Sequence, residues 1–203
     1  LQARAASFIL PPVIIPVFPQ FDSVSIVVCR GFARAIKFMV LKDFRHQRGG
    51  IQIMREFETE IKTDDGNMDV FICHPEQDGP HPAIILYMDA PGMREELRDM
   101  SRRIATVGYT VLLPNMYYRT GREGHYGYDL SKIRSDDDQR AKMFEVMNTL
   151  TNARVVHDTK GLLAFIDQCD AAAPGKVGCV GYCMSGQFVM SIGATYPDRF
   201  DAI

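Results

Sequence analysis

Three features that the sequence lacks exclude whole classes of protein. Prolines interrupt the apolar stretch 8–18, which is far short of the ~20 residues that a transmembrane helix needs. The net charge is only −2, which argues against nucleic acid as a partner. The five cysteines are scattered and include no CxxC pair, so neither a disulfide framework nor a zinc site is indicated. We therefore expect a cytoplasmic protein that binds no nucleic acid and no membrane.

The length and the charge distribution predict one domain preceded by an extension. A chain of 203 residues suits a single α/β domain, and no internal repeat is present. Residues 1–53 contain seven basic and two acidic residues, whereas the remainder is acidic. We interpret residues 1–53 as an extension of unclear origin outside the domain, with a basic targeting segment as the alternative. The domain then occupies residues 54–203, with Met54 as a natural start.

Alternating and continuous apolar runs predict the strands. Residues 57–63 and 68–73 alternate apolar and polar side chains around a turn, which is typical of a β-hairpin. Residues 83–88 are continuously apolar, as in a strand that is covered on both faces, and residues 110–114 are predicted as the next buried strand. An amphipathic helix over 94–106 separates these two strands, so a βαβ unit is expected.

Helical spacing predicts which residues of three helices face inward. On the first helix the predicted stripe is Leu97, Met100, Ile104 and Val107. Residues 136–150 form a polar helix, and Asn152 is the predicted N-cap of a helix over 152–168. The residues of this last helix that should face the sheet are Val155, Val156, Thr159, Leu162, Leu163 and Ile166.

A short strand, a tight turn and a helix surround Cys183. The apolar run 177–180 predicts a buried strand, and residues 186–196 resume at helical spacing, with Phe188, Val189 and Ile192 on one face. Gly181 and Ser185 are both small, as the strained turn of a nucleophile elbow requires. The turn also places Cys183 at a helix N-terminus, which favours a thiolate. The alternative is that Cys183 is merely a small buried hydrophobe.

Ser185 is the rival nucleophile, since serine is the commoner residue in such elbows. An elbow centred on Ser185 would require a small residue two positions later. Gln187 occupies that position. We therefore predict Cys183 as the nucleophile.

The segment Gly181–Gly186, with the sequence GYCMSG, resembles the elbow of the dienelactone hydrolase family, and the resemblance extends over most of residues 56–200. That family consists of cysteine hydrolases with the α/β-hydrolase fold. The resemblance implies a three-layer α/β architecture with a mostly parallel central sheet. It also implies hydrolysis of a small-molecule ester or lactone, with no metal or organic cofactor.

The same resemblance implies roles for the residues around the nucleophile. The backbone amides of Met184 and Ala90 correspond to the two donors of the oxyanion hole. Asp89 stands where better-known members have a glutamate that takes part in activating the thiol. The alternative for Asp89 is a cap of the turn that follows it.

Substrate-binding residues are expected on the loop and helix that follow the strand 110–114. Arg140 falls where the family places an arginine that binds the substrate carboxylate, and Phe144 replaces a tyrosine there, so that only stacking remains. The loop 115–135 is rich in Tyr and Gly, and we interpret it, with Tyr118, as facing the substrate. An ordinary surface loop is the alternative.

No histidine follows Cys183, although the order of catalytic residues in this fold is nucleophile, acid, histidine. We expect the acid and the histidine beyond Ile203, together with the missing C-terminal strands of the sheet. A histidine already present, His125 or His157, is the alternative base. A non-catalytic binding module of the same fold, or an inactive fragment, is the alternative function.

Overall fold

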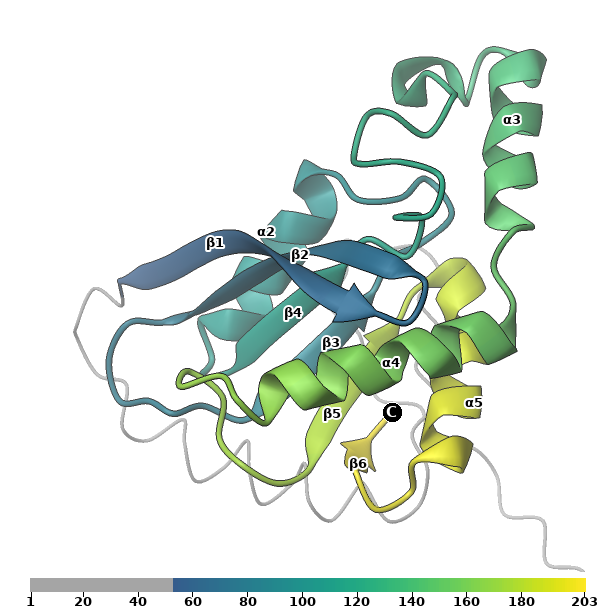
Figure 1. Ribbon diagram of the computed structural model, residues 1–203. Helices are drawn as coiled ribbons and strands as arrows, with labels where there is room; N and C mark the ends of the chain where they lie inside the picture. The colour runs from purple at the N-terminus through teal and green to yellow at the C-terminus, as the bar shows by residue number, and fades with distance from the viewer. Residues whose placement is uncertain (1–52) are drawn as a thin grey trace, which may run out of the picture.

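A six-stranded sheet runs through the computed structural model in the order β1-β2-β4-β3-β5-β6 (Figure 1). The structure describes residues 53–203, so all but the last residue of the predicted extension lies outside the described residues. The strands are β1 (Met54–Thr63), β2 (Gly66–Pro75), β3 (Ala83–Tyr87), β4 (Thr110–Pro114), β5 (Val177–Gly181) and β6 (Phe200–Ala202).

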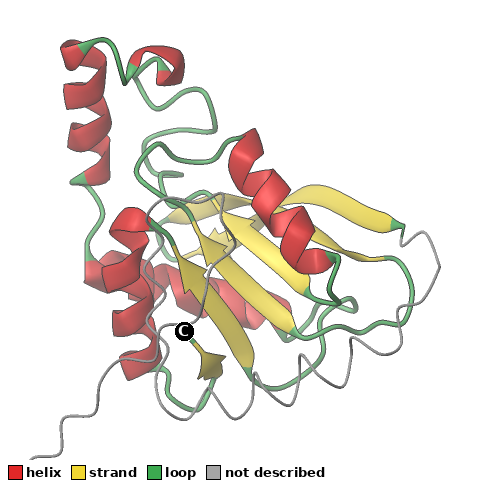
Figure 2. Cartoon of the chain, turned by 180° about the vertical axis from the view of Figure 1, so that it is seen from behind, coloured by secondary structure: helices red, strands yellow, loops and turns green. Residues whose placement is uncertain are grey.

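Helices cover both faces of the sheet and make three layers. One face carries α2 (Glu95–Ala105), and the other carries α4 (Asn152–Ile166) and α5 (Gly186–Thr195), as the two opposite views show (Figures 1 and 2). The helix α3 (Asp137–Met147) projects beyond the sheet, after the short 3-10 turn η1 (Leu130–Lys132). The three-layer prediction is confirmed.

The sheet is mixed, and its parallel part lies at the centre and at the β6 edge. β1 and β2 form the predicted antiparallel hairpin, and β2 also runs antiparallel to β4. β3 is parallel to β4 on one side and to β5 on the other, and β6 extends the parallel part. Because the carboxyl ends of parallel strands share one edge of a sheet, the segments that follow β3, β4 and β5 lie close together.

The continuous apolar runs form the core, as predicted. Every residue of β4 is buried, and Ile85 and Leu86 of β3 are completely inaccessible. Burial of each such side chain stabilises the fold by about 1.5–3 kcal/mol relative to an exposed one. The predicted inward face of α5 is confirmed by its three buried residues, which are Phe188, Val189 and Ile192.

Two details of the predicted helices are wrong. The N-cap of α4 is Thr151, whose hydroxyl accepts a hydrogen bond from the Arg154 amide at 3.2 Å. Val107 is 53% exposed, because α2 ends at Ala105 and helical spacing no longer applies beyond it. Beyond these two details, α4 buries Asp158, which is not among the residues predicted to face the sheet.

None of the helices between residues 53 and 203 combines the length and the apolar composition that crossing a bilayer requires.

Candidate active site

Cys183 lies on the turn between β5 and α5 in a conformation that is rare for a residue with a side chain. Its φ is +53°, in the left-handed region, and its side chain is exposed. Such a conformation costs on the order of 1–3 kcal/mol and is concentrated at functional sites. The turn continues as η2 (Cys183–Ser185), which leads directly into α5.

Backbone packing at this turn explains the glycine that precedes it. A Cβ on Gly181 would lie 2.5 Å from the Ser185 carbonyl oxygen and 2.9 Å from a methyl carbon of Val189. Contacts under 3.0 Å do not occur for real Cβ atoms, and a backbone oxygen cannot move away freely. Glycine is therefore required at position 181, which agrees with the sequence argument for a tight elbow.

Ser185 faces the opposite way from Cys183. Its side chain is completely buried, and its hydroxyl donates a hydrogen bond to the Met88 carbonyl at the end of β3. A hydroxyl held in this way is not accessible to a substrate. Of the two candidate nucleophiles, Cys183 is exposed and Ser185 is buried.

Asp89 and Ala90 follow β3 and lie beside the elbow. Tyr87, at the end of β3, is in register with Gly181 at the end of β5. The carboxylate of Asp89 forms a bidentate ion pair with Arg94, with N–O distances of 2.5 and 2.9 Å. Sequence reasoning missed Arg94, because a loop arginine five residues after an aspartate has no periodic signal.

The two predicted oxyanion donors have free N–H groups. Within residues 53–203, neither the Ala90 amide nor the Met184 amide donates a hydrogen bond to another protein group. Both residues follow parallel strands that are hydrogen-bonded to each other. Free backbone donors at adjacent strand ends are what a developing negative charge on oxygen requires.

Tyr117 is the tyrosine of the loop after β4 that contacts the elbow. Its hydroxyl donates to the Ala90 carbonyl at 2.8 Å and lies 3.5 Å from the Met184 sulfur. Sequence reasoning named its neighbour Tyr118 instead. The hydroxyl of Tyr118 is bonded to Thr63 at 2.7 Å and to Asp158 at 2.9 Å.

Arg119 completes this second cluster around Tyr118. Its guanidinium pairs with the buried Asp158 at 2.7 Å and with the exposed Asp65 at 2.6 Å, and it lies over the Tyr118 ring at 4.4 Å. Burial raises the pKa of Tyr118 to about 12, although its hydrogen bond with Thr63 acts in the opposite direction. The cluster joins the loop after β4 to the β1–β2 hairpin and to α4.

Arg140 and Phe144 both lie on α3. The guanidinium of Arg140 pairs with Asp137 of the same helix, and the Phe144 ring is 44% exposed. No described contact joins either residue to Cys183, so their binding role stays a prediction.

None of the four described histidines contacts Cys183. His125 is exposed and bonded to the Glu123 carbonyl, and the His157 ring nitrogen lies 2.6 Å from a carboxylate oxygen of Asp64. His81 is buried at the opposite end of β3, and its Nε2 has no partner among the described residues. No group of three metal-ligating side chains was found between residues 53 and 203.

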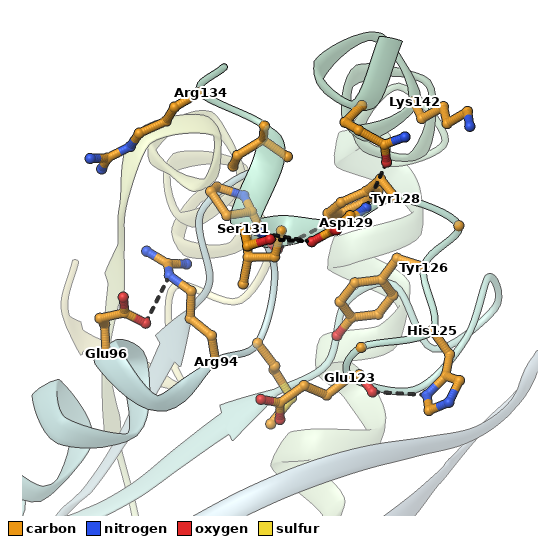
Figure 3. Close-up of a pocket in the computed structure, with 17 residues that line it drawn as sticks. Arg94, Glu96, Glu123, His125, Tyr126, Tyr128, Asp129, Ser131, Arg134 and Lys142 are labelled. Atoms are coloured by element: carbon orange, nitrogen blue, oxygen red, sulfur yellow. Dashed lines mark hydrogen bonds and ion pairs between the residues drawn. The ribbon is translucent and has the colours of Figure 1, made fainter. Parts of the chain in front are cut away.

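A cavity of about 1280 Å³ lies beside the Asp89–Arg94 pair, between the 91–96 segment, the 123–134 loop and α3 (Figure 3). Tyr126 and Tyr128 line it, with ring centroids 5.8 Å apart. Each of its three acidic residues is ion-paired; these residues are Glu96, Glu123 and Asp129. Arg134 and Lys142, on opposite sides of it, form no ion pair among the described residues. The lining therefore carries three Arg or Lys side chains and three acidic ones, and two of the cations have no acidic partner among the described residues.

A protein-family model matches most of the described chain. The model of the dienelactone hydrolase family matches residues 68–203. A protein of Methylorubrum extorquens assigned as a carboxymethylenebutenolidase is 27% identical over 140 residues, which are 69% of this chain and 45% of that protein. A protein of Synechocystis with the same assignment is 23% identical and is covered to 48%. The chain thus spans about half the length of these relatives.

Solved structures show the same fold. A protein from Klebsiella pneumoniae assigned as a dienelactone hydrolase has a TM-score of 0.55 at 23% identity, and the match covers 67% of this chain and 54% of that one. A cold-adapted esterase from an Arctic metagenomic library also has a TM-score of 0.55, at 14% identity, over 77% of this chain and 63% of that one. At this identity the likeness concerns the α/β-hydrolase architecture alone.

Proposed function

Because the chain belongs to the dienelactone hydrolase family, we propose that it supplies Cys183 as the nucleophile for hydrolysis of an ester or lactone bond in a small molecule. The observation that carries this proposal is the exposed thiol of Cys183 at φ +53°, on the turn between β5 and α5. A strained nucleophile on such a turn is the hallmark of the α/β-hydrolase elbow.

The first step would be attack of the Cys183 thiolate on the carbonyl carbon. A carbon–sulfur bond forms, and the carbonyl electron pair moves to the oxygen to give a tetrahedral oxyanion. The amides of Ala90 and Met184 are the proposed donors to that oxygen, since their N–H groups are free. When the tetrahedral intermediate collapses, the bond between the carbonyl carbon and the alcohol oxygen breaks and a thioester of Cys183 remains. In a lactone the released alcohol stays attached to the acyl group through the rest of the ring.

Asp89 is the proposed partner of the thiol. Its carboxylate accepts one hydrogen bond from Arg94 on each oxygen, so each oxygen keeps a second lone pair for the thiol proton. Water must then be activated to hydrolyse the thioester, and this step needs a general base. We assign it to a histidine, and none of the histidines between residues 53 and 203 has a described contact with Cys183.

For the substrate we keep the predicted binders Arg140, Phe144 and Tyr118. An anionic substrate is supported by Arg134 and Lys142, two cations of the adjoining cavity that form no ion pair among the described residues. Arginine suits a carboxylate because the guanidinium donates two parallel hydrogen bonds. We also retain the domain boundary at Met54 and a cytoplasmic location as predictions.

One observation favours a second function, a non-catalytic binding module of the same fold. None of the histidines between residues 53 and 203 contacts Cys183, although a cysteine hydrolase needs a base for deacylation. In that case the cavity would bind a ligand without hydrolysing it.

The test uses the whole 203-residue chain with p-nitrophenyl acetate and a dienelactone. We expect one equivalent of nitrophenolate per chain, followed by slow turnover, and an acetyl group on the peptide that contains Cys183. Cys183→Ala should abolish both signals. Equal release by Cys183→Ala, or acetylation at another residue, would contradict the proposed nucleophile, and no release at all would favour the binding module.

A further inference from the structure

The hydroxyl of Tyr117 touches both residues whose amides are the proposed oxyanion donors. It donates a hydrogen bond to the Ala90 carbonyl at 2.8 Å and lies 3.5 Å from the Met184 sulfur. Ala90 follows β3 and Met184 follows β5. Tyr117 itself follows β4, so it reaches both segments from a third strand.

The surroundings of Tyr117 hold its ring in one place. The residue is 1% exposed, and its own amide donates to the side-chain oxygen of Asn115, which is completely buried. A Cβ on Gly92 would lie 3.3 Å from the Tyr117 ring and 2.8 Å from the Tyr126 ring. The turn that carries Ala90 is therefore packed directly against two tyrosine rings.

The phenol of Tyr117 stays protonated over the working pH range. Burial raises its pKa well above the usual value for tyrosine, and the neighbouring Tyr128, Asp89, Tyr126 and Cys183 act in the same direction. The hydroxyl accordingly keeps its proton and remains a donor to the Ala90 carbonyl.

We propose that Tyr117 is a positioning residue that fixes the distance between the Ala90 and Met184 amides. The inference rests on the proposed function and extends it to a residue that does not touch the substrate. An oxyanion hole works only when both donors lie 2.7–3.1 Å from the oxygen, and loss of one donor costs roughly 10²–10³ in rate. If the distance between the two amides is only less well fixed, the acylation rate should fall less, by about tenfold.

Two rates of the same thiol separate this role from a merely structural one. Acylation of Cys183 by p-nitrophenyl acetate passes through an oxyanion, whereas alkylation by iodoacetamide displaces iodide from a saturated carbon and forms none. In Tyr117→Phe the ring remains and the hydroxyl is lost. We expect acylation to slow about tenfold while alkylation changes less than about twofold.

Tyr196→Phe is the matched control. Tyr196 donates a hydrogen bond to the Val156 carbonyl at 3.1 Å, lies at the C-terminal end of α5, and does not line the cavity beside Arg94. We expect both rates to stay within about twofold of the wild-type rates in this variant.

The outcomes distinguish the inference from the proposed function. Acylation by Tyr117→Phe at the wild-type rate, or an equal fall of both rates, overturns the inference and leaves the nucleophile in place. Absence of Cys183 acylation in the wild-type chain overturns both. If Tyr117→Phe loses its cooperative melting transition, the two rates are measured on Met184→Leu, which removes the sulfur contact and keeps the amide; equal changes in both rates then overturn the inference.

Discussion

The Cys183 thiol is exposed while the Ser185 hydroxyl, two residues later on the same turn, is buried against the Met88 carbonyl. The positive φ of Cys183 reverses the chain between β5 and α5 and points the two side chains in different directions. The buried hydroxyl ties the elbow to the end of β3. The exposed thiol is left beside the turn that carries Asp89.

The elbow should tolerate a methyl group at one of its glycines and not at the other. Gly181→Ala forces a Cβ to 2.5 Å from the Ser185 carbonyl, and we expect a loss of about 2–4 kcal/mol in the free energy of unfolding. Gly186 is the control, because it is helical and a Cβ there meets nothing within 4 Å. Gly186→Ala should stabilise the fold by about 0.5–1 kcal/mol. Urea unfolding of both variants is the measurement. Equal changes in the free energy of unfolding would contradict the close packing around Gly181.

The cysteines should differ in their reactivity toward iodoacetamide. Burial raises the pKa of Cys73 and of Cys179 to about 12, so near pH 8 both remain thiols in the folded chain. We expect Cys183, which is exposed, to be labelled first, and the other two only after unfolding. Their folded pKa values exceed the unfolded values, so their contribution to stability is lost as the pH rises from about 9 to 12. Peptide mass spectrometry after a short pulse is the measurement, and early labelling of Cys179 would contradict the assignment.

The strain at Cys183 should be visible in two substitutions that both remove the thiol. At φ +53° a Cβ is disfavoured, whereas glycine adopts this region freely. We expect Cys183→Gly to be at least as stable as Cys183→Ala, by up to about 1 kcal/mol, although glycine is usually the more destabilising residue. Thermal melting of the two variants measures this difference in stability. A clearly more stable alanine variant would show that the turn is not strained.

The two carboxylates that pair with Arg119, those of Asp158 and Asp65, should contribute unequally to the stability of the fold. Asp158 has a side chain that is 7% exposed, whereas that of Asp65 is 52% exposed. We expect Asp158→Asn to cost about 2–3 kcal/mol of stability, because a buried charged hydrogen bond is weakened. Asp65→Asn should cost clearly less stability than Asp158→Asn, since solvent screens that pair. Added salt should weaken only the Asp65 contribution.

Local pattern was enough to predict the elements and the elbow. The apolar runs of β3 and β4 and the spacing of Phe188, Val189 and Ile192 depend only on neighbours along the chain, and each was found in the predicted place. The need for a small residue at Gly181 is likewise local, because the carbonyl oxygen that a Cβ would approach belongs to Ser185, four residues later.

Only the tertiary structure decided which polar side chains meet. Tyr117 and Tyr118 are adjacent and chemically alike, yet Asn115 and Gly92 direct the first toward the elbow, and Asp158 binds the second. The pairing of Asp89 with Arg94 had no pattern to reveal it. Such partners depend on distances that arise when strands and loops far apart in the sequence pack together, and the identity of a residue carries no information about those distances.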